Sequence, residues 1–522
     1  MSGLDSVVII DFGSQFTQLI ARRVRESHVY CTIEPPHLSL SQLQASKPKA
    51  MILSGGPHSV NEPNAPQLNP ELLQLNTPIL AICYGMQWLC AHLGGTLHHA
   101  KAREFGAATL TTTATSKLTQ GIWQQGQSAH VWMSHGDHVT QAPAGFKVLA
   151  RSADIPIAML GDDTRKLYGV QFHPEVVHTP EGAKLLARFV HDIAGCRKQW
   201  TSTHIIDTTT AAIRAQVQPK GKKAGHVICA LSGGVDSAVC AALLQRALGS
   251  DSLTCIFIDN GLLRLNEAEA VVNLAKKHIQ APLLHMDEGA MFLQRLDGIS
   301  DPEDKRRIIG HTFIECFQRA AQQIPAAQYL AQGTVYPDVI ESATTSGHAT
   351  TIKSHHNVGG LPETMPFQLV EPLRALFKDE VRAIGRQLGL PVELIQRHPF
   401  PGPGLAIRIP DTITPDKIAI LQRADAIYLN ALRAAKLYDE IWQAFCVLLP
   451  VRSVGVMGDR RSYQYTLALR AVTSTDGMTA QAYPLPHELL QTIAHTIINN
   501  VDGINRVLYD VTSKPPATIE WE

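Results

Sequence analysis

Short apolar runs alternate with helical patterns along the first part of the chain. Residues 7–10, 50–53 and 79–82 are apolar and of strand length, and helical spacing of apolar positions begins near residue 15 and recurs up to residue 93. Alternating strands and helices predict a mostly parallel sheet covered by helices on both faces. In such sheets, functional groups collect where the strands end at their carboxyl side.

The same rhythm returns after residue 225 and then changes. Beyond residue 397, a stretch rich in proline and glycine is followed by two helical patterns and three further strand patterns. We therefore predict an α/β protein with two doubly wound, mostly parallel-sheet domains at 1–198 and 199–396, followed by a small α+β dimerisation domain at 397–522. That last domain leaves apolar faces to cover, which indicates a homodimer.

Composition narrows the choice of partners and compartment. Lys and Arg number 46, as do Asp and Glu, so no overall basic field favours nucleic acid or an anionic membrane. The nine cysteines have no CxxC spacing, which argues against a zinc site and for reduced thiols in the cytoplasm. No apolar run is long enough to span a bilayer, so we expect a soluble protein with no membrane partner.

Cys83 lies where the strand at 79–82 turns into a helix, as in a nucleophile elbow with Cys in place of Ser. Its position near a helix N-terminus favours the thiolate. Backbone N–H groups of Gly55, Gly56 and Tyr84 are candidate donors to an oxyanion. The alternative is a small buried hydrophobic residue, the interpretation we give to Cys90, Cys229, Cys240 and Cys255.

A thiol nucleophile needs a base and a group that orients it. The apolar stretch at 168–172 is followed by His173-Pro174-Glu175, so His173 is the candidate base and Glu175 its orienting carboxylate. Together with Cys83 they predict acyl transfer from an amide. His135 competes for the role of base or shapes the pocket, whereas we expect His130, His138 and His178 at the surface.

A second candidate site follows the strand that begins at Val227. The stretch Ser232-Gly233-Gly234-Val235-Asp236-Ser237, called the phosphate loop below, has two glycines, two hydroxyls and a following helix, which favour a polyphosphate. It lacks the Lys of a Walker loop. A plain Gly-Gly turn is the alternative.

Other polar stretches add weaker candidates. Asp259 ends the next strand, where nucleotide contacts occur, although an Asn-Gly turn explains the stretch equally simply. Lys378 reaches the triphosphate of ATP or forms a helix-surface ion pair. The carboxylates within 332–342 are candidates for magnesium or a hydroxyl group, and the glycine-rich stretch 353–362 for a lid.

Three basic or acidic stretches near the end of the chain are also candidates. Lys305, Arg306 and Arg307 are successive cations that a solvated helix face explains. The stretch 397–408 predicts a rigid, non-helical crossing whose two arginines, Arg397 and Arg408, flank it like clamps for a phosphate monoester. In the tail, Lys514 is suited to a phosphate and Glu520 to a purine N–H donor.

These motifs carry family resemblances. Residues 1–198 resemble the class I glutamine amidotransferases, which usually have Gly where this chain has Ala81, so we expect a slightly altered elbow. That resemblance implies that Gln87 and the segment 134–137 help to bind glutamine. The phosphate loop resembles that of the ATP pyrophosphatases, which release pyrophosphate after adenylating a substrate.

The whole chain, with its PFPGPGLA and KPPATIEWE stretches, resembles the family of glutamine-hydrolysing GMP synthases. The resemblance implies adenylation of xanthosine monophosphate (XMP) with Mg²⁺ and ATP, and displacement of AMP by ammonia to give GMP. It assigns Asp236 to the pyrophosphate, Arg306, Lys514 and Glu520 to XMP, and the C-terminal domain to homodimerisation. The magnesium ligands stay unassigned. The residues proposed for ATP are Ser232, Gly233, Gly234, Val235, Asp236, Ser237, Asp259 and Lys378.

Three alternative functions fit the sequence less well. An enzyme that activates a tRNA base for thiolation is expected to have a basic groove and a CxxC pair, and the sequence has no CxxC pair. An NAD synthetase shares the loop but usually lacks this triad and tail. A binding protein without activity fits poorly with chemical groups at three separate places.

Overall fold

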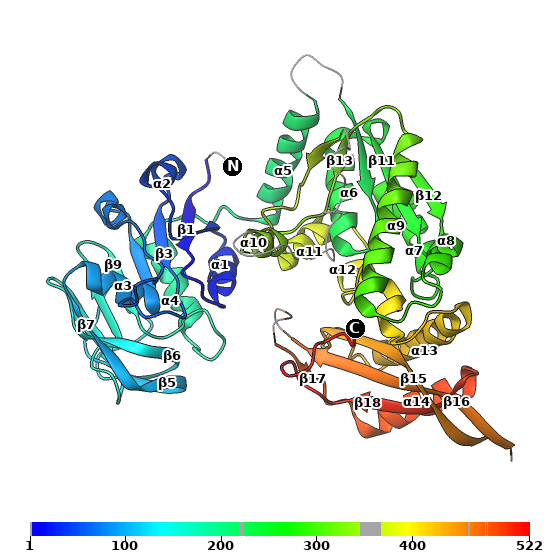
Figure 1. Cartoon of the computed structure of the whole chain (residues 1–522). Helices are drawn as coiled ribbons and strands as arrows, with labels where there is room; N and C mark the ends of the chain where they lie inside the picture. The colour runs from blue at the N-terminus through cyan, green and yellow to red at the C-terminus, as the bar shows by residue number, and fades with distance from the viewer. Residues whose placement is uncertain (1–2, 219–223, 345–366, 458–459, 475–476, 478) are drawn as a thin grey trace. The chain divides into compact units, whose positions relative to one another are not determined.

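The structure is a computed structural model that describes the chain except for residues 1–2, 219–223, 345–366, 458–459, 475–476 and 478. The chain divides into two compact units, Met1–His204 and Ile205–Glu522 (Figure 1). Within the described residues, no helix is both long and apolar enough to cross a membrane.

The first unit is built on a nine-stranded sheet in the order β2-β1-β3-β4-β9-β8-β7-β5-β6. Its first five strands in this order run parallel, and they are β1 (Ser6–Ile10), β2 (Tyr30–Glu34), β3 (Ala50–Leu53), β4 (Ile79–Ile82) and β9 (Leu167–Val170). The remaining strands are antiparallel, and they are β5 (Thr96–Thr112), β6 (Ser128–Gln141), β7 (Lys147–Arg151) and β8 (Met159–Asp162). The sequence pattern did not reveal this antiparallel half.

Every residue of β3 and β4 is buried, as expected for strands covered on both faces. The unit's helices are α1 (Thr17–Glu26), α2 (Leu40–Ser46), α3 (Tyr84–His92) and α4 (Gly182–Arg188), with single turns η1 (Pro70–Leu75) and η2 (Phe189–Ile193). Helix α3 is buried on all sides over its first two turns, and its Trp88 is fully buried in the core. The strand that delivers Cys83 is thus held in the middle of the unit.

The second unit opens with α5 (Ser202–Val217), which spans the division, and contains a fully parallel sheet in the order β12-β11-β10-β13-β14. The strands are β10 (His226–Ala230), β11 (Leu253–Asp259), β12 (Leu283–Asp287), β13 (Ala327–Ala331) and β14 (Gln368–Val370). The chain moves outward from β10 to β12 and then returns to β13 on the other side of β10. This switch point lies at the carboxyl end of β10, where the phosphate loop begins.

Helices flank this parallel sheet (Figure 1). They are α6 (Val235–Leu248), α7 (Glu267–Leu274), α8 (Gly289–Arg295), α9 (Pro302–Gln322), α10 (Tyr336–Thr344), α11 (Lys378–Gln387) and α12 (Val392–Ile395), with single turns η3 (Ser250–Ser252) and η4 (Ala275–Ile279). The doubly wound arrangement that the sequence predicted for both large domains is confirmed.

The C-terminal part of the second unit has an α+β arrangement. Strands β15 (Gln443–Met457) and β16 (Arg460–Thr473) form a long antiparallel pair, β18 (Ile504–Asp510) lies parallel to β16, and β17 (Gln481–Ala482) pairs with its end. Helices α13 (Pro415–Ala434) and α14 (His487–Asn500) accompany them. One hydrophobic cluster, which includes Ile256, Leu405 and Leu467, continues from the parallel sheet into this part. The divisions at residues 198 and 396 stay predictions.

Two expectations were wrong in this region. Gly404–Arg408 forms a single 3-10 turn, η6, inside the crossing that we expected to be non-helical. Lys305, expected on a solvated helix face, is fully buried, and its Nζ donates to the Ile409 carbonyl and the Glu522 carboxylate, both at 2.7 Å. Burial of an ammonium group requires such partners. This contact attaches the end of the tail to α9.

Candidate active sites

Cys83 sits at a strained turn between β4 and α3. Its φ of 50° and ψ of −108° are unusual for a residue with a side chain, and its N–H donates to the Val170 carbonyl of β9 at 2.8 Å. A Cβ on Gly85 would lie 2.7 Å from the Leu53 carbonyl oxygen, so the helix approaches β3 this closely only with glycine there. Ala81 is accommodated as a buried residue of β4. The elbow therefore forms with Ala in place of the family's Gly.

The structure brings the three predicted triad residues together. His173 Nδ1 lies 2.7 Å from Glu175 Oε1, and both side chains are buried. Gly55 lies against both His173 and Cys83. A Cβ at residue 55 would be 3.1 Å from His173 Cε1 and 3.6 Å from Cys83 Cβ. The elbow, the His-Glu pair and the glycine loop thus surround one point at the ends of parallel strands.

His173 has an unusual protonation equilibrium. Burial alone lowers its pKa, but the Glu175 carboxylate and hydrogen bonds to Cys83 and Glu175 outweigh burial and raise the pKa from 6.5 to about 10. At neutral pH the ring therefore holds a proton. A protonated imidazole next to a thiol is suited to protonate a leaving amine.

Sequence reasoning missed several groups around the triad. Gln171 places Nε2 3.6 Å from the Cys83 sulfur, and the thiol donates to the Ser134 carbonyl at 3.5 Å. The ring of Phe16 meets His173 edge-on with centroids 5.1 Å apart, and the Thr179 hydroxyl donates to the His173 carbonyl at 2.7 Å. Gln171 had a signal, because it lies two residues before His173 on the same face of the chain. No pattern in the sequence pointed to Phe16 or Thr179 as neighbours of His173.

The residues assigned to glutamine by resemblance have internal partners. Gln87 is buried and its Nε2 donates to the Asp137 carbonyl at 2.7 Å, which connects α3 to the segment 134–137. His135 Nε2 lies 3.1 Å from Glu104, and burial lowers the pKa of His135 to about 4. His138 is buried, so our surface assignment for it was wrong. The roles of Gln87 and this segment in binding stay predictions.

The phosphate loop forms a concave turn ahead of α6. Ser232 Oγ and Ser237 Oγ lie 3.1 Å apart, and the Gly234 N–H points at Ser232 Oγ over 3.4 Å. A Cβ on Gly234 would meet only Ser232 Oγ within 4 Å, so the space next to Gly234 is open. Gly333, at the end of β13, packs against the backbone of Asp236 and Ser237. An anion thus has access to hydroxyls, backbone N–H groups and a helix N-terminus.

Other predicted ATP residues lie around the loop or at the next strand. Lys378 Nζ is 3.3 Å from Asp236 Oδ2, and Asp236 Oδ1 is buried without a hydrogen-bond partner in the described part of the chain. Asp259 Oδ1 accepts the N–H of Gly261, whose φ is +71°, at 2.9 Å. The stretch after β11 is thus a side-chain-capped turn, and its contact with nucleotide stays a prediction.

Each predicted XMP residue is engaged with another protein group. Arg306 pairs with Glu303 at 2.6 Å, Lys514 donates to the Gly477 carbonyl at 2.8 Å, and Glu520 pairs with Arg408 at 2.9 Å. Arg397 and Arg408, expected to clamp a phosphate, are paired with Glu267 and Glu520. Their contact with a phosphate stays a prediction.

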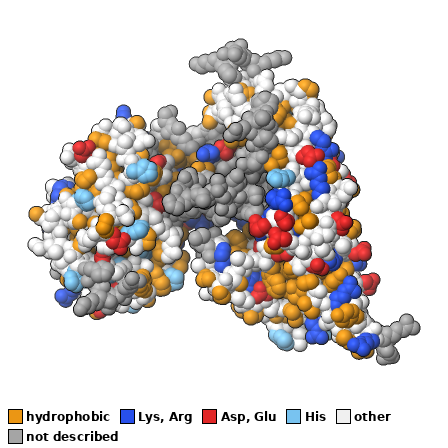
Figure 2. Space-filling view, viewed as in Figure 1, with side chains coloured by type: hydrophobic (Ala, Val, Ile, Leu, Met, Phe, Trp, Pro, Cys, Tyr) orange, Lys and Arg blue, Asp and Glu red, His pale blue; other side chains and the backbone are white. Residues whose placement is uncertain are grey.

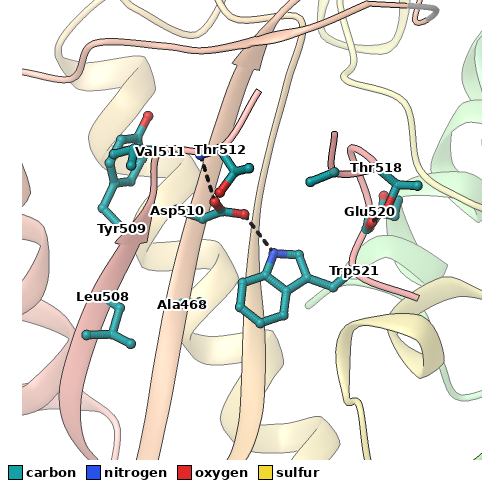
Figure 3. A pocket seen from close by; sticks show the side chains of 10 residues that line it. Ala468, Leu508, Tyr509, Asp510, Val511, Thr512, Thr518, Glu520 and Trp521 are labelled. Atoms are coloured by element: carbon teal, nitrogen blue, oxygen red, sulfur yellow. Dashed lines mark hydrogen bonds between the residues drawn. The ribbon is translucent and has the colours of Figure 1, made fainter. Parts of the chain in front are cut away.

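Glu520 also lines a pocket of about 550 Å³ between the end of β18 and the tail (Figure 3). The Trp521 indole donates to Asp510 at 3.1 Å across the floor of this pocket. Its volume is that of a small-molecule site.

Two weaker candidates remain open. The stretch 353–362, the candidate lid, lies outside the described residues, as does the Glu341 side chain. No group of three or more His, Cys, Asp or Glu residues suited to a metal ion occurs within the described residues.

Family models match three parts of the chain. Residues 8–193 match the class I glutamine amidotransferases, residues 205–296 the NAD synthases, and residues 430–521 the GMP synthase C-terminal domain. The fold, the Cys-His-Glu arrangement and the phosphate loop thus define an ATP-dependent ligase of the amidotransferase class.

Curated relatives match the full length. A glutamine-hydrolysing GMP synthase of Rhodopseudomonas palustris is 56% identical over 519 residues, which cover 99% of this chain and 95% of that protein. Proteins of the same name from Bradyrhizobium diazoefficiens and Bartonella henselae are 56% and 55% identical over 522 residues, all of this chain and 94% and 100% of theirs. The chain belongs to the family of glutamine-hydrolysing GMP synthases.

Proposed function

We propose that the protein converts XMP, ATP and glutamine into GMP, AMP, pyrophosphate and glutamate. One observation carries this proposal. This chain, a member of the family, contains both an assembled Cys-His-Glu set and an open phosphate loop. Two sites are required because the xanthine C2 oxygen is a poor leaving group until it is adenylated, and because ammonia must be supplied as the neutral nucleophile.

In the first site, Cys83 reacts as the thiolate beside the protonated His173, and its sulfur attacks the side-chain amide carbon of glutamine. N–H groups of Gly55, Gly56 and Tyr84 stabilise the oxyanion, and His173 gives its proton to the departing ammonia. Water then hydrolyses the thioester to glutamate, with His173 as general base. Glu175 holds the imidazole through the 2.7 Å hydrogen bond and stabilises its charge.

In the second site, the C2 oxygen of XMP attacks the α-phosphorus of ATP and pyrophosphate leaves. Ammonia then adds at C2 and AMP leaves. Backbone N–H groups and hydroxyls of the phosphate loop hold the leaving pyrophosphate, and Lys378 lies within reach of the same charge. The Oδ1 of Asp236, which has no hydrogen-bond partner among the described residues, would serve as a carboxylate ligand for Mg²⁺ bound with ATP, and the ion would supply further positive charge.

For XMP we propose recognition by Arg306, Lys514 and Glu520. Glu520 lines the pocket of Figure 3. Lys305, the residue before Arg306 on α9, donates to Glu522 at 2.7 Å, so this turn of α9 contacts the tail. Binding requires XMP to replace the present partners of these side chains.

The test is to mix the protein with XMP, MgATP and glutamine and to follow the fall in ultraviolet absorbance as XMP becomes GMP. AMP, pyrophosphate and glutamate are expected in equal amounts. ADP and phosphate as products, or no GMP in the presence of all three substrates, would overturn the proposal.

We also propose that the protein is a homodimer that pairs through its C-terminal sheet. Large apolar side chains are exposed on and next to β15, β16 and β18, and hydrophobic side chains gather over this part of the surface (Figure 2). Val456 is 78% exposed. Val456→Glu should convert a dimer into a monomer in light scattering, whereas a monomeric wild-type protein would contradict the proposal.

A cytoplasmic location is proposed from the cysteines. All nine are free and buried, which is usual for proteins of a reducing compartment.

A further inference from the structure

Arg397 reaches the phosphate loop from a distant part of the chain. It follows α12, and its Nη1 donates to the carbonyl oxygen of Gly233 at 2.9 Å. Its other terminal nitrogen pairs with the Glu267 carboxylate. Both groups are largely buried, and Glu267 also accepts the backbone N–H of Arg264 at 2.9 Å. The guanidinium is thus fixed by an ion pair and directed at one backbone carbonyl.

The contact sets the orientation of the peptide between Gly233 and Gly234. In a trans peptide the C=O and N–H point in opposite directions. With the Gly233 carbonyl held by Arg397, the Gly234 N–H points to the inner side of the loop, where Ser232 Oγ lies 3.4 Å away. If the peptide flipped, it would present a carbonyl oxygen to the phosphate in place of a donor.

The loop backbone needs this support. Gly233 has φ of +77°, and a Cβ there would lie 2.7 Å from Val271 Cγ2. Glycine removes the steric obstacle but leaves many backbone conformations accessible. A charge-assisted hydrogen bond to its carbonyl selects one of them.

Arg397 also lies over an aromatic ring. Its guanidinium lies 5.6 Å from the Phe400 centroid, and the Arg408 guanidinium lies 5.1 Å from the same ring. Arg408 is the partner of Glu520. The conformation of the proline-rich stretch 397–408 therefore determines the position of the Arg397 guanidinium.

We infer that Arg397 is a positioning residue for adenylation: it holds the Gly233 carbonyl away from the bound nucleotide and keeps the Gly234 N–H directed at the pyrophosphate of ATP. This inference rests on the proposed function, because it requires ATP at the phosphate loop. Arg397 does not touch the nucleotide itself.

The experiment measures ammonium-dependent GMP synthesis by the full-length protein, with KM for MgATP, KM for XMP, and inhibition by inorganic pyrophosphate. Arg397→Met should raise the KM for MgATP and the inhibition constant of pyrophosphate together, roughly 10- to 100-fold, the effect of losing a hydrogen bond to a charged group. The KM for XMP should change less than about twofold. Arg397→Lys, which keeps a donor, should restore part of the affinity. Arg423→Met, on the exposed face of α13, is the matched control.

Glu267→Gln separates positioning from direct phosphate binding. Loss of the carboxylate charge loosens Arg397, so positioning predicts a higher KM for MgATP. If Arg397 instead bound the phosphate directly, Glu267→Gln would free its guanidinium for that contact and the KM for MgATP would fall. A lower KM for MgATP would therefore overturn the inference. Unchanged KM and pyrophosphate inhibition in a folded Arg397→Met protein would also overturn it. If Arg397→Met does not fold, the same measurements on Arg397→Lys and Glu267→Gln test the inference. Absence of GMP synthesis by the wild-type protein would instead count against the proposed function.

Discussion

The two candidate sites use the same strand-loop-helix geometry but differ in how far each is assembled. In the first unit the candidate catalytic side chains are buried: Cys83, His173 and Glu175 are at most 4% exposed, and His173 lies 2.7 Å from Glu175. In the second unit the phosphate loop is open, and the Lys378 side chain beside it is 48% exposed. Both sites lie at the carboxyl ends of parallel strands.

The difference follows from the chemistry of each step. Covalent attack by a thiol requires a base and an orienting carboxylate in fixed positions before the substrate arrives. Adenylation requires mainly that a highly charged nucleotide be surrounded by hydrogen-bond donors, so such a site needs fewer side chains fixed in advance. The first site can therefore be recognised from side chains alone, whereas the second is defined largely by backbone.

The largest expected effect separates the two sites. Cys83→Ala removes the nucleophile, so glutamine-dependent GMP synthesis should fall on the order of 10⁴-fold or more, while synthesis from added ammonium stays unchanged. Rates with each nitrogen source provide the measurement. Cys90→Ala, at another buried thiol of α3, is the control. Loss of both activities in a folded Cys83→Ala protein would contradict separable sites.

The reverse separation should follow from Asp236→Asn. Because the change removes a carboxylate from the phosphate loop, synthesis from either nitrogen source should fall roughly 10³-fold, the effect of losing several kcal/mol of charge stabilisation. The first unit should keep its thiol chemistry, measured as labelling of Cys83 by a glutamine-like electrophile. Asp251→Asn, at an exposed turn, is the control. Normal synthesis by Asp236→Asn would exclude a role for this carboxylate.

A third prediction concerns how the second unit holds its tail. Glu522→Ala leaves the fully buried Lys305 ammonium with carbonyl partners only, so the second unit should lose about 3 kcal/mol of stability. Thermal unfolding of the variant gives the measurement. Glu303→Ala breaks the exposed pair with Arg306 and should cost about 0–1 kcal/mol. Equal effects of the two changes would contradict the burial argument.

The smallest expected effect is a difference in pH dependence. The raised pKa of His173, about 10, means that its pair with Glu175 stabilises the first unit fully below pH 6.5 and loses this effect as the pH rises toward 10. In the second unit, burial lowers the pKa of His398 to about 4, so stability falls as the pH drops from 6.5 toward 4. Burial also lowers the pKa of His135 to about 4, so the first unit loses stability as well when the pH drops from 6.5 toward 4.

The test compares unfolding temperatures of the wild type and Glu175→Gln between pH 7 and 9. The wild type should lose about 2–3 kcal/mol more over this interval, because nearly one proton per molecule separates the folded and unfolded states throughout it. Identical slopes would show that the buried pair does not hold its proton.

Patterns local in sequence allowed correct predictions. Strands at 50–53 and 79–82 occur at the predicted residues, because continuous apolar runs are typical of parallel strands covered on both faces. The triad was predicted because His173 and Glu175 are only two residues apart and Cys83 directly follows a strand. The structure brings these residues together as the motif suggested.

Contacts between distant segments could not be predicted. Lys305 and Glu522 are 217 residues apart, and Arg397 and Gly233 are 164 apart, so neither pairing leaves a periodic signal. The ion pair between Arg408 and Glu520 joins residues 112 apart and could not be predicted for the same reason. The strands β5 to β8 were not predicted. In β6, buried residues alternate with less buried ones over much of the strand, which is a weaker signal than the continuous apolar runs of the parallel strands.

The most direct measurement follows the nitrogen atom. The protein is incubated with XMP, MgATP and glutamine that is isotope-labelled in its amide group, and the GMP is analysed by mass spectrometry. One labelled nitrogen is expected in each GMP formed, with one AMP and one glutamate. Unlabelled GMP, or labelled ammonia released without GMP, would contradict it.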